Sequence, residues 1–325
     1  MPRSEAGVAT LSNPLPTKIK RLRKRTAASA RQRSLRNARE WGIAGLLFCA
    51  AALSVLVTAS IVFVLLFESA QFFRHVSIVE FLTGTKWSPS FANPKFGILP
   101  LVCGTLLTTG VALAVALPIG TVVAIYLSEF APFSVREVLK PMLELLSAVP
   151  TVVYGYFAIG FVAPTLQLFI PNLPTFSVLS AGLVMGIMII PYVSSLSEDA
   201  MRSVPMLLRE GSYALGANKI RTALAVVFPS ALSGIGAAYI LGISRAIGET
   251  MIVAIAAGMQ PKLTLNPTEP AATMTAFIVQ VSLGDAAHGS IEYQSIFAAG
   301  LVLFLMTLAF NVLGYILRRR YHQAY

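Results

Sequence analysis

Two oppositely charged residues, Arg245 and Glu249, stand four positions apart inside a long apolar stretch, and Thr250 follows them directly. An ionisable side chain at membrane depth costs about 3 kcal/mol or more on insertion scales, so it indicates function by default. In a continuous helix, residues i and i+4 share one face and can form an ion pair. The spacing therefore predicts an Arg–Glu site within a membrane span, with Thr250 as a weaker member. The alternative is a structural pair that only holds helices together.

The chemistry of this pair suits a protonated oxyanion. The guanidinium of Arg245 presents a planar fork of N–H donors that matches phosphate or a similar anion. A carboxylate beside it repels a fully deprotonated oxyanion but accepts a hydrogen bond from one that carries a proton, such as hydrogen phosphate. Sulfate carries no proton at neutral pH. If Arg245 and Glu249 both face a pathway, the pair therefore favours phosphate over sulfate.

A second patterned segment lies between two apolar stretches, over residues 197–229. It contains Glu210, Gly211, Ser212, Gly216 and Pro229, whose spacing is compared with a family motif below. Proline is well suited to the start of a helix, so Pro205 predicts a short helix over Met206–Leu215. Gly216 can then take the left-handed conformation that ends such a helix. The pattern predicts a docking helix, as opposed to an ordinary amphipathic loop helix.

Other chemistry is poorly represented. The two cysteines, Cys49 and Cys103, lie in apolar runs, and the three histidines are far apart in sequence, so we expect neither a disulfide framework nor a metal site. No phosphate-binding loop sequence occurs, which argues against ATP binding by this chain. Glu144 lies near the inner end of a predicted span and is a weaker site candidate, because a carboxylate at the membrane interface costs little.

Composition places these residues in a membrane protein. The chain has 325 residues, of which 56% are hydrophobic and 12% are charged, whereas soluble domains carry about 25% charged residues. This excludes a soluble globular enzyme and predicts an all-α integral membrane protein. A membrane-spanning helix needs about 20 mainly apolar residues. Six stretches qualify, roughly Gly42–Phe67, Ile98–Leu127, Met142–Val162, Ser177–Leu196, Ser230–Ala257 and Gln294–Leu317.

The distribution of basic residues predicts the orientation of these six spans. Cytoplasmic segments of membrane proteins are rich in Lys and Arg. With both termini inside, the inner segments carry 20 Lys and Arg and the outer segments carry 4. A further apolar segment, Ala271–Leu283, is too short to span and is predicted to be re-entrant or interfacial. Counting it as a span would place the basic C-terminal residues outside, against the rule.

Helix-distorting and small residues recur within the spans. Pro118, Pro150 and Pro191 are predicted to bend or break their helices. Gly182 and Gly186 form a small-x-x-x-small pair that lets two helices approach closely. These features fit a bundle that encloses a pathway better than a simple membrane anchor.

The chain divides into four predicted regions. Residues 1–40 form a basic, mostly disordered cytoplasmic tail, and residues 1–41 account for +9 of the net charge of +11. Residues 41–97 hold the first span and an outside loop, residues 98–318 form the core with the loop 197–229, and residues 319–325 form the inner C-terminus. The tail has no aromatic residue for stacking on bases, so we attribute it to membrane orientation and lipid attraction, with no nucleic-acid partner.

Several segments resemble one family. Residues 245–251 are similar to the R-A-x-G-E-T-M signature of phosphate ABC-transporter permeases, and residues 210–229 resemble the E-A-A-x3-G-x9-I-x-L-P motif of ABC-importer permeases. Gly211 and Ser212 depart mildly from the two alanines of that motif. Pro141–Phe157, Phe81–Trp87 and Phe96–Pro100 are similar to corresponding regions of the PstC-type permeases. The resemblance covers roughly Glu68 to Arg318.

The resemblance implies a type I ABC-importer permease fold in the bacterial inner membrane, with Arg245 and Glu249 on a phosphate pathway. It implies coupling to ATPase subunits through Glu210–Pro229. The implied partners are a PstA-like permease subunit with its own Arg–Glu pair, two ATPase subunits, a periplasmic phosphate-binding protein, phosphate and membrane lipid. The chain itself is expected to be no enzyme and to hold no cofactor, because ATP and Mg bind to the ATPase subunits.

Other functions are compatible with the same residues. The chain could be the PstA-type partner, or a permease for sulfate, molybdate or phosphonate, which competition of labelled phosphate uptake by each anion would separate. A membrane regulator or scaffold that transports nothing is a different class. It predicts no transport defect when the Glu210–Gly216 segment is altered.

Overall fold

The computed structural model describes residues 17–91 and 93–320, almost all of them helical or in short connections. In chain order the elements are α1 (Thr17–Phe72), α2 (Ile78–Thr83), β1 (Trp87–Ser88), β2 (Lys95–Phe96), α3 (Leu99–Ile125), the π-helical turn η1 (Tyr126–Phe130), α4 (Phe133–Ala148), α5 (Thr151–Phe157), η2 (Ala158–Val162), α6 (Ala163–Phe169), α7 (Val178–Arg202), α8 (Met206–Ala214), α9 (Lys219–Thr222), η3 (Ala223–Val227), α10 (Phe228–Ser230), α11 (Leu232–Ile247), α12 (Met251–Ala256), α13 (Met274–Ser282) and α14 (Ile291–Arg320).

The number of candidate spans agrees with the sequence. Within the described residues, five helices are long and apolar enough to cross a membrane. A sixth span results when Lys219–Ser230 and Leu232–Ile247, which meet at a bend of 72°, are counted together. The chain divides into two compact units, Met1–Phe63 and Val64–Tyr325, and the elements that concern function lie in the second.

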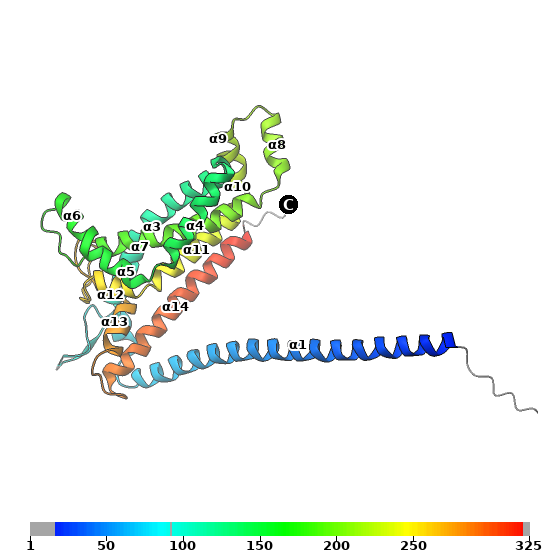
Figure 1. Ribbon diagram of the computed structural model, residues 1–325. Helices are drawn as coiled ribbons and strands as arrows, with labels where there is room; N and C mark the ends of the chain where they lie inside the picture. The colour runs from blue at the N-terminus through cyan, green and yellow to red at the C-terminus, as the bar shows by residue number, and fades with distance from the viewer. Residues whose placement is uncertain (1–16, 92, 321–325) are drawn as a thin grey trace, which may run out of the picture. The chain divides into compact units, whose positions relative to one another are not determined.

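The centre of the second unit is the packing of α3 against α7, which α11 joins (Figure 1). Glycines allow this approach. A Cβ atom at Gly186 would lie 2.8 Å from the carbonyl oxygen of Ala112, and one at Gly182 would lie 2.7 Å from the Val111 side chain. The prediction that Gly182 and Gly186 form a close helix contact is confirmed. Of the three predicted proline distortions, Pro118 and Pro191 lie inside continuous helices.

Pro150 has a different role from the predicted bend inside a span. The helix stops at Ala148 and a new one starts at Thr151, so the third candidate span is Thr151–Phe169 and not Met142–Val162. Proline has no N–H, which leaves the carbonyl of Leu146 without its helical donor. The Tyr154 hydroxyl donates to that carbonyl at 2.7 Å. A side chain thus satisfies the backbone group that the break exposes.

The predicted fifth span, Ser230–Ala257, is also interrupted. The structure has α11 over 16 residues, then Gly248 to Thr250, then the six-residue α12. A helix of 16 residues is about 24 Å long, shorter than the hydrocarbon core of about 30 Å. The prediction of one continuous helix through Arg245 and Glu249 was therefore wrong, because Gly248 ends α11 and leaves Arg245 in the helix and Glu249 in the break that follows it.

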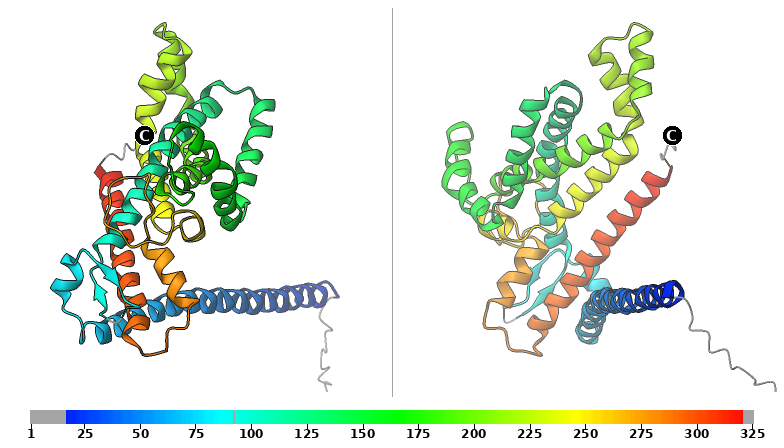
Figure 2. Two further views of the ribbon diagram at one scale, coloured as in Figure 1. Left: turned by 90° about the vertical axis from the view of Figure 1, so that its left-hand side faces the viewer. Right: turned by 45° about the vertical axis from the view of Figure 1, so that its right-hand side comes forward.

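Short elements cover the end of the bundle near α12. The hairpin β1–β2 and α2 surround an aromatic cluster in which Trp87 meets Phe277 of α13 edge-on, with ring centroids 4.9 Å apart. The helix α13 has nine residues and does not qualify as a span among the described helices, as predicted for Ala271–Leu283. Figure 2 shows α8 and α9 beyond the opposite end of the bundle.

The basic tail differs from the predicted disorder where the structure describes it. The helix α1 begins at Thr17 and continues without a break to Phe72, so residues 17–40 are helical, while residues 1–16 lie outside the described residues. Propagating a helix costs far less than starting one. An Ala-, Arg- and Lys-rich segment that precedes a membrane helix therefore extends it.

Candidate functional site

Arg245 and Glu249 lie near each other at the end of α11, where the helix is interrupted at Gly248–Thr250. The Arg245 Nη2 and Glu249 Oε2 atoms are 3.8 Å apart, close enough for an ion pair and too far for a hydrogen bond. The side chain of Glu249 is 3% exposed, whereas that of Arg245 is 41% exposed. The structure therefore confirms the predicted proximity of the two groups and gives them unequal surroundings.

Glu249 is fixed by the helix that follows it. Its Oε1 accepts hydrogen bonds from the backbone N–H groups of Met251 and Ile252, at 3.2 and 3.4 Å. These are among the N–H groups that every helix start leaves without partners. The carboxylate thus caps α12, and its Oε2 has no hydrogen-bond partner within the described residues. One oxygen of Glu249 thus serves the fold, and the other lies 3.8 Å from Arg245.

A neighbouring short helix holds the backbone at the same point. Thr275 of α13 donates through its hydroxyl to the carbonyl of Glu249 at 2.7 Å. The backbone N–H of Met274 in turn donates to Thr105 of α3 at 3.1 Å. The weaker candidate Thr250 is the N-cap residue of α12, and its hydroxyl lies 3.3 Å from the Gly248 carbonyl. The break is therefore supported by both α3 and α13.

Arg245 keeps its donors free. Within the residues that the structure describes, its guanidinium makes no hydrogen bond. Its neighbours are Glu249 and the ring of Tyr192 in α7, whose centroid lies 5.7 Å from the guanidinium carbon. A cation over an aromatic face is held without using its N–H groups. All five donors of the fork therefore lack a hydrogen-bond acceptor among the described residues. Tyr192 was not identified from the sequence, because an isolated tyrosine in an apolar helix carries no signal.

The predicted docking segment forms the helix α8 followed by a turn. Pro205 precedes the helix as its N-cap residue, and Gly216 has φ of +81°, as expected for the left-handed residue that ends a helix. The N–H of Gly216 donates to Tyr213 and that of Ala217 donates to Ser212, which is the paired pattern of a Schellman motif. The prediction for the start and end of this helix is confirmed to within one residue.

Most of α8 is open to solvent. Leu207 is 78% exposed and Met206 is 60% exposed, and Glu210 and Gly211 are exposed as well. Ser212 instead turns inward, with its hydroxyl 2.9 Å from that of Thr222 in α9. Pro229 lies in α10, immediately before the bend that leads into α11. The segment thus presents apolar and acidic side chains outward while its base is attached to the bundle.

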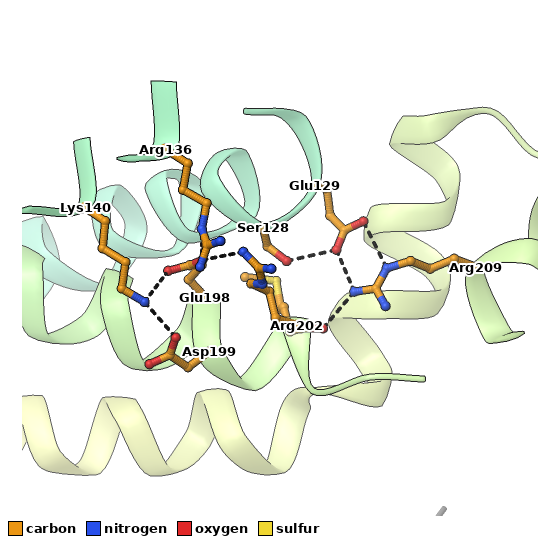
Figure 3. Close-up of polar contacts among 9 residues, drawn as sticks. Ser128, Glu129, Arg136, Lys140, Glu198, Asp199, Arg202 and Arg209 are labelled. Carbon is orange, nitrogen blue, oxygen red and sulfur yellow. Dashed lines mark hydrogen bonds and ion pairs between the residues drawn. The ribbon is translucent and has the colours of Figure 1, made fainter. Parts of the chain in front are cut away.

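Figure 3 shows two ion-pair clusters near the base of α8 that the sequence did not predict. The buried carboxylate of Glu198 in α7 lies 2.7 Å from Arg136 and 3.0 Å from Lys140, both of α4. Arg209 of α8 pairs with Glu129 of η1 at 2.9 Å. The partners are 58 to 80 residues apart, so no local pattern reports them.

These contacts stabilise the protonated, positively charged form of Lys140. Partial burial lowers the pKa of Lys140, but hydrogen bonds to Asp199 and Glu198 and the charges of both carboxylates outweigh it. The pKa of Lys140 therefore lies above its ordinary value, and α4 stays tied to α7 at neutral pH. Glu144, on the same helix, is exposed and its role stays a prediction. Across residues 17–91 and 93–320, no group of three or more His, Cys, Asp or Glu side chains could hold a metal ion.

The chain is similar to known proteins over most of its length. Residues 116–323 match the family described as "Binding-protein-dependent transport system inner membrane component". "Probable ABC transporter permease protein YqgH" of Bacillus subtilis is 37% identical over 73% of this chain and 77% of its own length. "Phosphate transport system permease protein PstC" of Mesorhizobium japonicum is 31% identical over 83% of this chain and 88% of its own length.

Solved structures share the fold at low sequence identity. A chain from a bacterial ABC transporter involved in the import of alginate gives a TM-score of 0.64 at 15% identity, covering 88% of this chain and 97% of that chain. A chain from the MetNI methionine ABC transporter, in an inward-facing conformation, gives a TM-score of 0.51 at 15% identity, covering 70% and 94%. Both likenesses confirm the predicted type I permease fold.

The contrast between two glycines tests the turn that ends α8. Gly216→Ala should place an alanine at positive φ, at a cost of about 1–2 kcal/mol, and speed amide hydrogen exchange in Met206–Ala214 by about 5- to 30-fold. The control, Gly211→Ala, lies in helical backbone with equally open surroundings. It should slow the same exchange, because alanine favours a helix over glycine by about 1 kcal/mol. Equal effects of the two substitutions would contradict this explanation.

Proposed function

The chain belongs to the binding-protein-dependent transport system inner membrane component family, and we propose that it is the permease subunit of an ATP-driven phosphate importer. As a member of this family it is a multi-pass protein of the bacterial inner membrane. The observation that carries the proposal of phosphate is the geometry at the break, where Arg245 holds a free donor fork beside the buried carboxylate of Glu249. The PstC relatives named for phosphate transport support it.

The two groups divide the recognition of hydrogen phosphate between them. Arg245 donates to the charged oxygens, for which its bidentate geometry is suited. Glu249 accepts a hydrogen bond from the remaining O–H of the anion through Oε2, because Oε1 is occupied by the start of α12. Sulfate has no proton to donate and would leave Oε2 facing a lone pair. A site built to accept a substrate O–H rejects analogues without one by a factor of about 10⁴.

The energy for transport comes from other subunits in this proposal. Two ATPase subunits bind ATP and Mg and contact the exposed face of α8, where Glu210 and Leu207 point outward. A PstA-like permease completes the pathway with a second Arg–Glu pair, and a periplasmic binding protein delivers phosphate to the opposite face. This chain hydrolyses no ATP. The chain binds the anion transiently during transport, and the accessibility of the Arg245–Glu249 site changes when α8 moves.

Removing the guanidinium tests whether Arg245 binds the anion. Arg245→Ala should lower phosphate uptake about 100-fold or more, because two charge-assisted hydrogen bonds of about 1.5–3 kcal/mol each are lost. Arg245→Lys keeps the charge without the fork and should give an intermediate rate. Uptake of labelled phosphate is measured in cells with equal amounts of each variant. The control is Arg74→Gln, at an exposed arginine in the turn after α1. A rate of phosphate uptake by Arg245→Ala equal to that of the wild type would contradict the proposal.

Replacing the acceptor tests the basis of selectivity. Glu249→Gln keeps the oxygen that caps α12 and exchanges Oε2 for an N–H donor, so sulfate should gain a partner that it lacks in the wild type. We expect the sulfate concentration that halves phosphate uptake to fall about 10-fold or more, the effect of one hydrogen bond of about 1.4 kcal/mol. Molybdate and a phosphonate are tested in parallel. Strong competition by any of them in the wild type would favour a permease for that anion.

A further inference from the structure

Arg209 is a buried cation at the base of α8. It is only 9% exposed and lies between half-buried Leu208 and exposed Glu210. Its Nη1 donates to the carbonyl of Val204 at 2.6 Å, and its Nη2 donates to that of Met201 at 2.8 Å. These carbonyls belong to the end of α7 and the turn that follows it. One guanidinium therefore fastens α8 to α7.

The same guanidinium reaches a third element. Nη2 and Nε of Arg209 donate to the two carboxylate oxygens of Glu129, at 2.9 and 3.3 Å (Figure 3). The Glu129 side chain is 6% exposed and also accepts from the Ser128 hydroxyl at 2.9 Å. Glu129 lies in η1, which continues α3 without interruption. Removing one partner of such a buried pair is strongly destabilising, so α8 and the end of α3 are held together firmly.

The helix α3 connects this pair to the Arg245–Glu249 site. Near its other end, Thr105 accepts a hydrogen bond from the backbone of Met274 in α13, and Thr275 of α13 donates to the carbonyl of Glu249. The helix is continuous from Leu99 to Ile125 and packs along α7. A displacement of α8 that shifts α3 would therefore also shift the backbone of Glu249.

We infer that the Arg209–Glu129 ion pair is the link through which movement of α8, driven by the ATPase subunits, is transmitted to α3 and the anion site. The inference rests on the proposed function, and it makes Arg209 and Glu129 positioning residues. Two adjacent residues of α8 have different roles in this inference. Glu210 faces outward and contacts the ATPase, whereas Arg209 faces inward and contacts the bundle. The Glu198 cluster joins α4 to α7 without a bond to α8 and serves as scaffold.

The most specific test is the variant Glu129→Gln. It removes the ion pair with the end of α3 and leaves the two hydrogen bonds from Arg209 to carbonyls of α7 and the turn after it in place. The matched control is Glu137→Gln, the same change at an exposed acid of α4. Complete transporter complexes in proteoliposomes should hydrolyse ATP with either variant. With Glu129→Gln the phosphate imported per ATP should fall about fivefold or more, the lower end of typical coupling between sites. Glu129→Asp, which keeps the charge, should recover at least half of the loss.

Amide hydrogen exchange tests the coupling between α8 and α3 in the absence of phosphate. A non-hydrolysable ATP analogue should alter exchange in both α8 and Tyr126–Phe130 of the wild-type complex, and in α8 alone with Glu129→Gln. An unchanged ratio of phosphate to ATP would overturn the inference, as would an equal fall with Glu137→Gln. A proportional loss of uptake and ATP hydrolysis would assign the pair to assembly only and also overturn it. Failure of the phosphate proposal would appear in the wild type, which would import no phosphate, while the exchange measurement would still report the link.

Discussion

Backbone polar groups that cannot reach water need partners within the protein, and side chains supply such partners at two breaks between helices. At the first break Pro150 removes a donor, and the Tyr154 hydroxyl replaces it on the carbonyl of Leu146. At the second break, Gly248–Thr250, the carboxylate of Glu249 takes up two N–H groups of α12. The second repair has a functional consequence, since it places one acidic oxygen in the fold and leaves the other beside Arg245.

The break also explains how a charge can persist in this span. In an unbroken helix, Arg245 and Glu249 would be free to form a close, mutually saturating pair. Here Glu249 is drawn toward α12 and the two side chains stop at 3.8 Å. Tyr192 supports the guanidinium through its ring face. The pair is thus held in a state that is electrically compensated but has unused donors and one unused acceptor. An anion with both charge and a proton would complete it.

The sequence predicted features that depend on local patterns and missed those that depend on tertiary context. Apolar length located the first, second, fourth and sixth spans, and the Pro205–Gly216 spacing located α8, because both signals depend on contiguous residues. The continuous apolar run of residues 230–257 concealed the interruption at Gly248, since hydropathy does not report helix ends and a single glycine is tolerated in a helix. Arg209 and Glu129 are 80 residues apart, and only the packing of α8 against η1 brings them together.

In the proposed transport cycle, the break leaves Arg245 and one oxygen of Glu249 ready for the transported anion. A structure of the assembled importer with phosphate held in its translocation pathway tests this arrangement. We expect phosphate oxygens about 2.7–3.2 Å from the Arg245 guanidinium and from Oε2 of Glu249, with Oε1 still on the amides of Met251 and Ile252. Phosphate bound elsewhere, with Arg245 turned into a contact between helices, would contradict it.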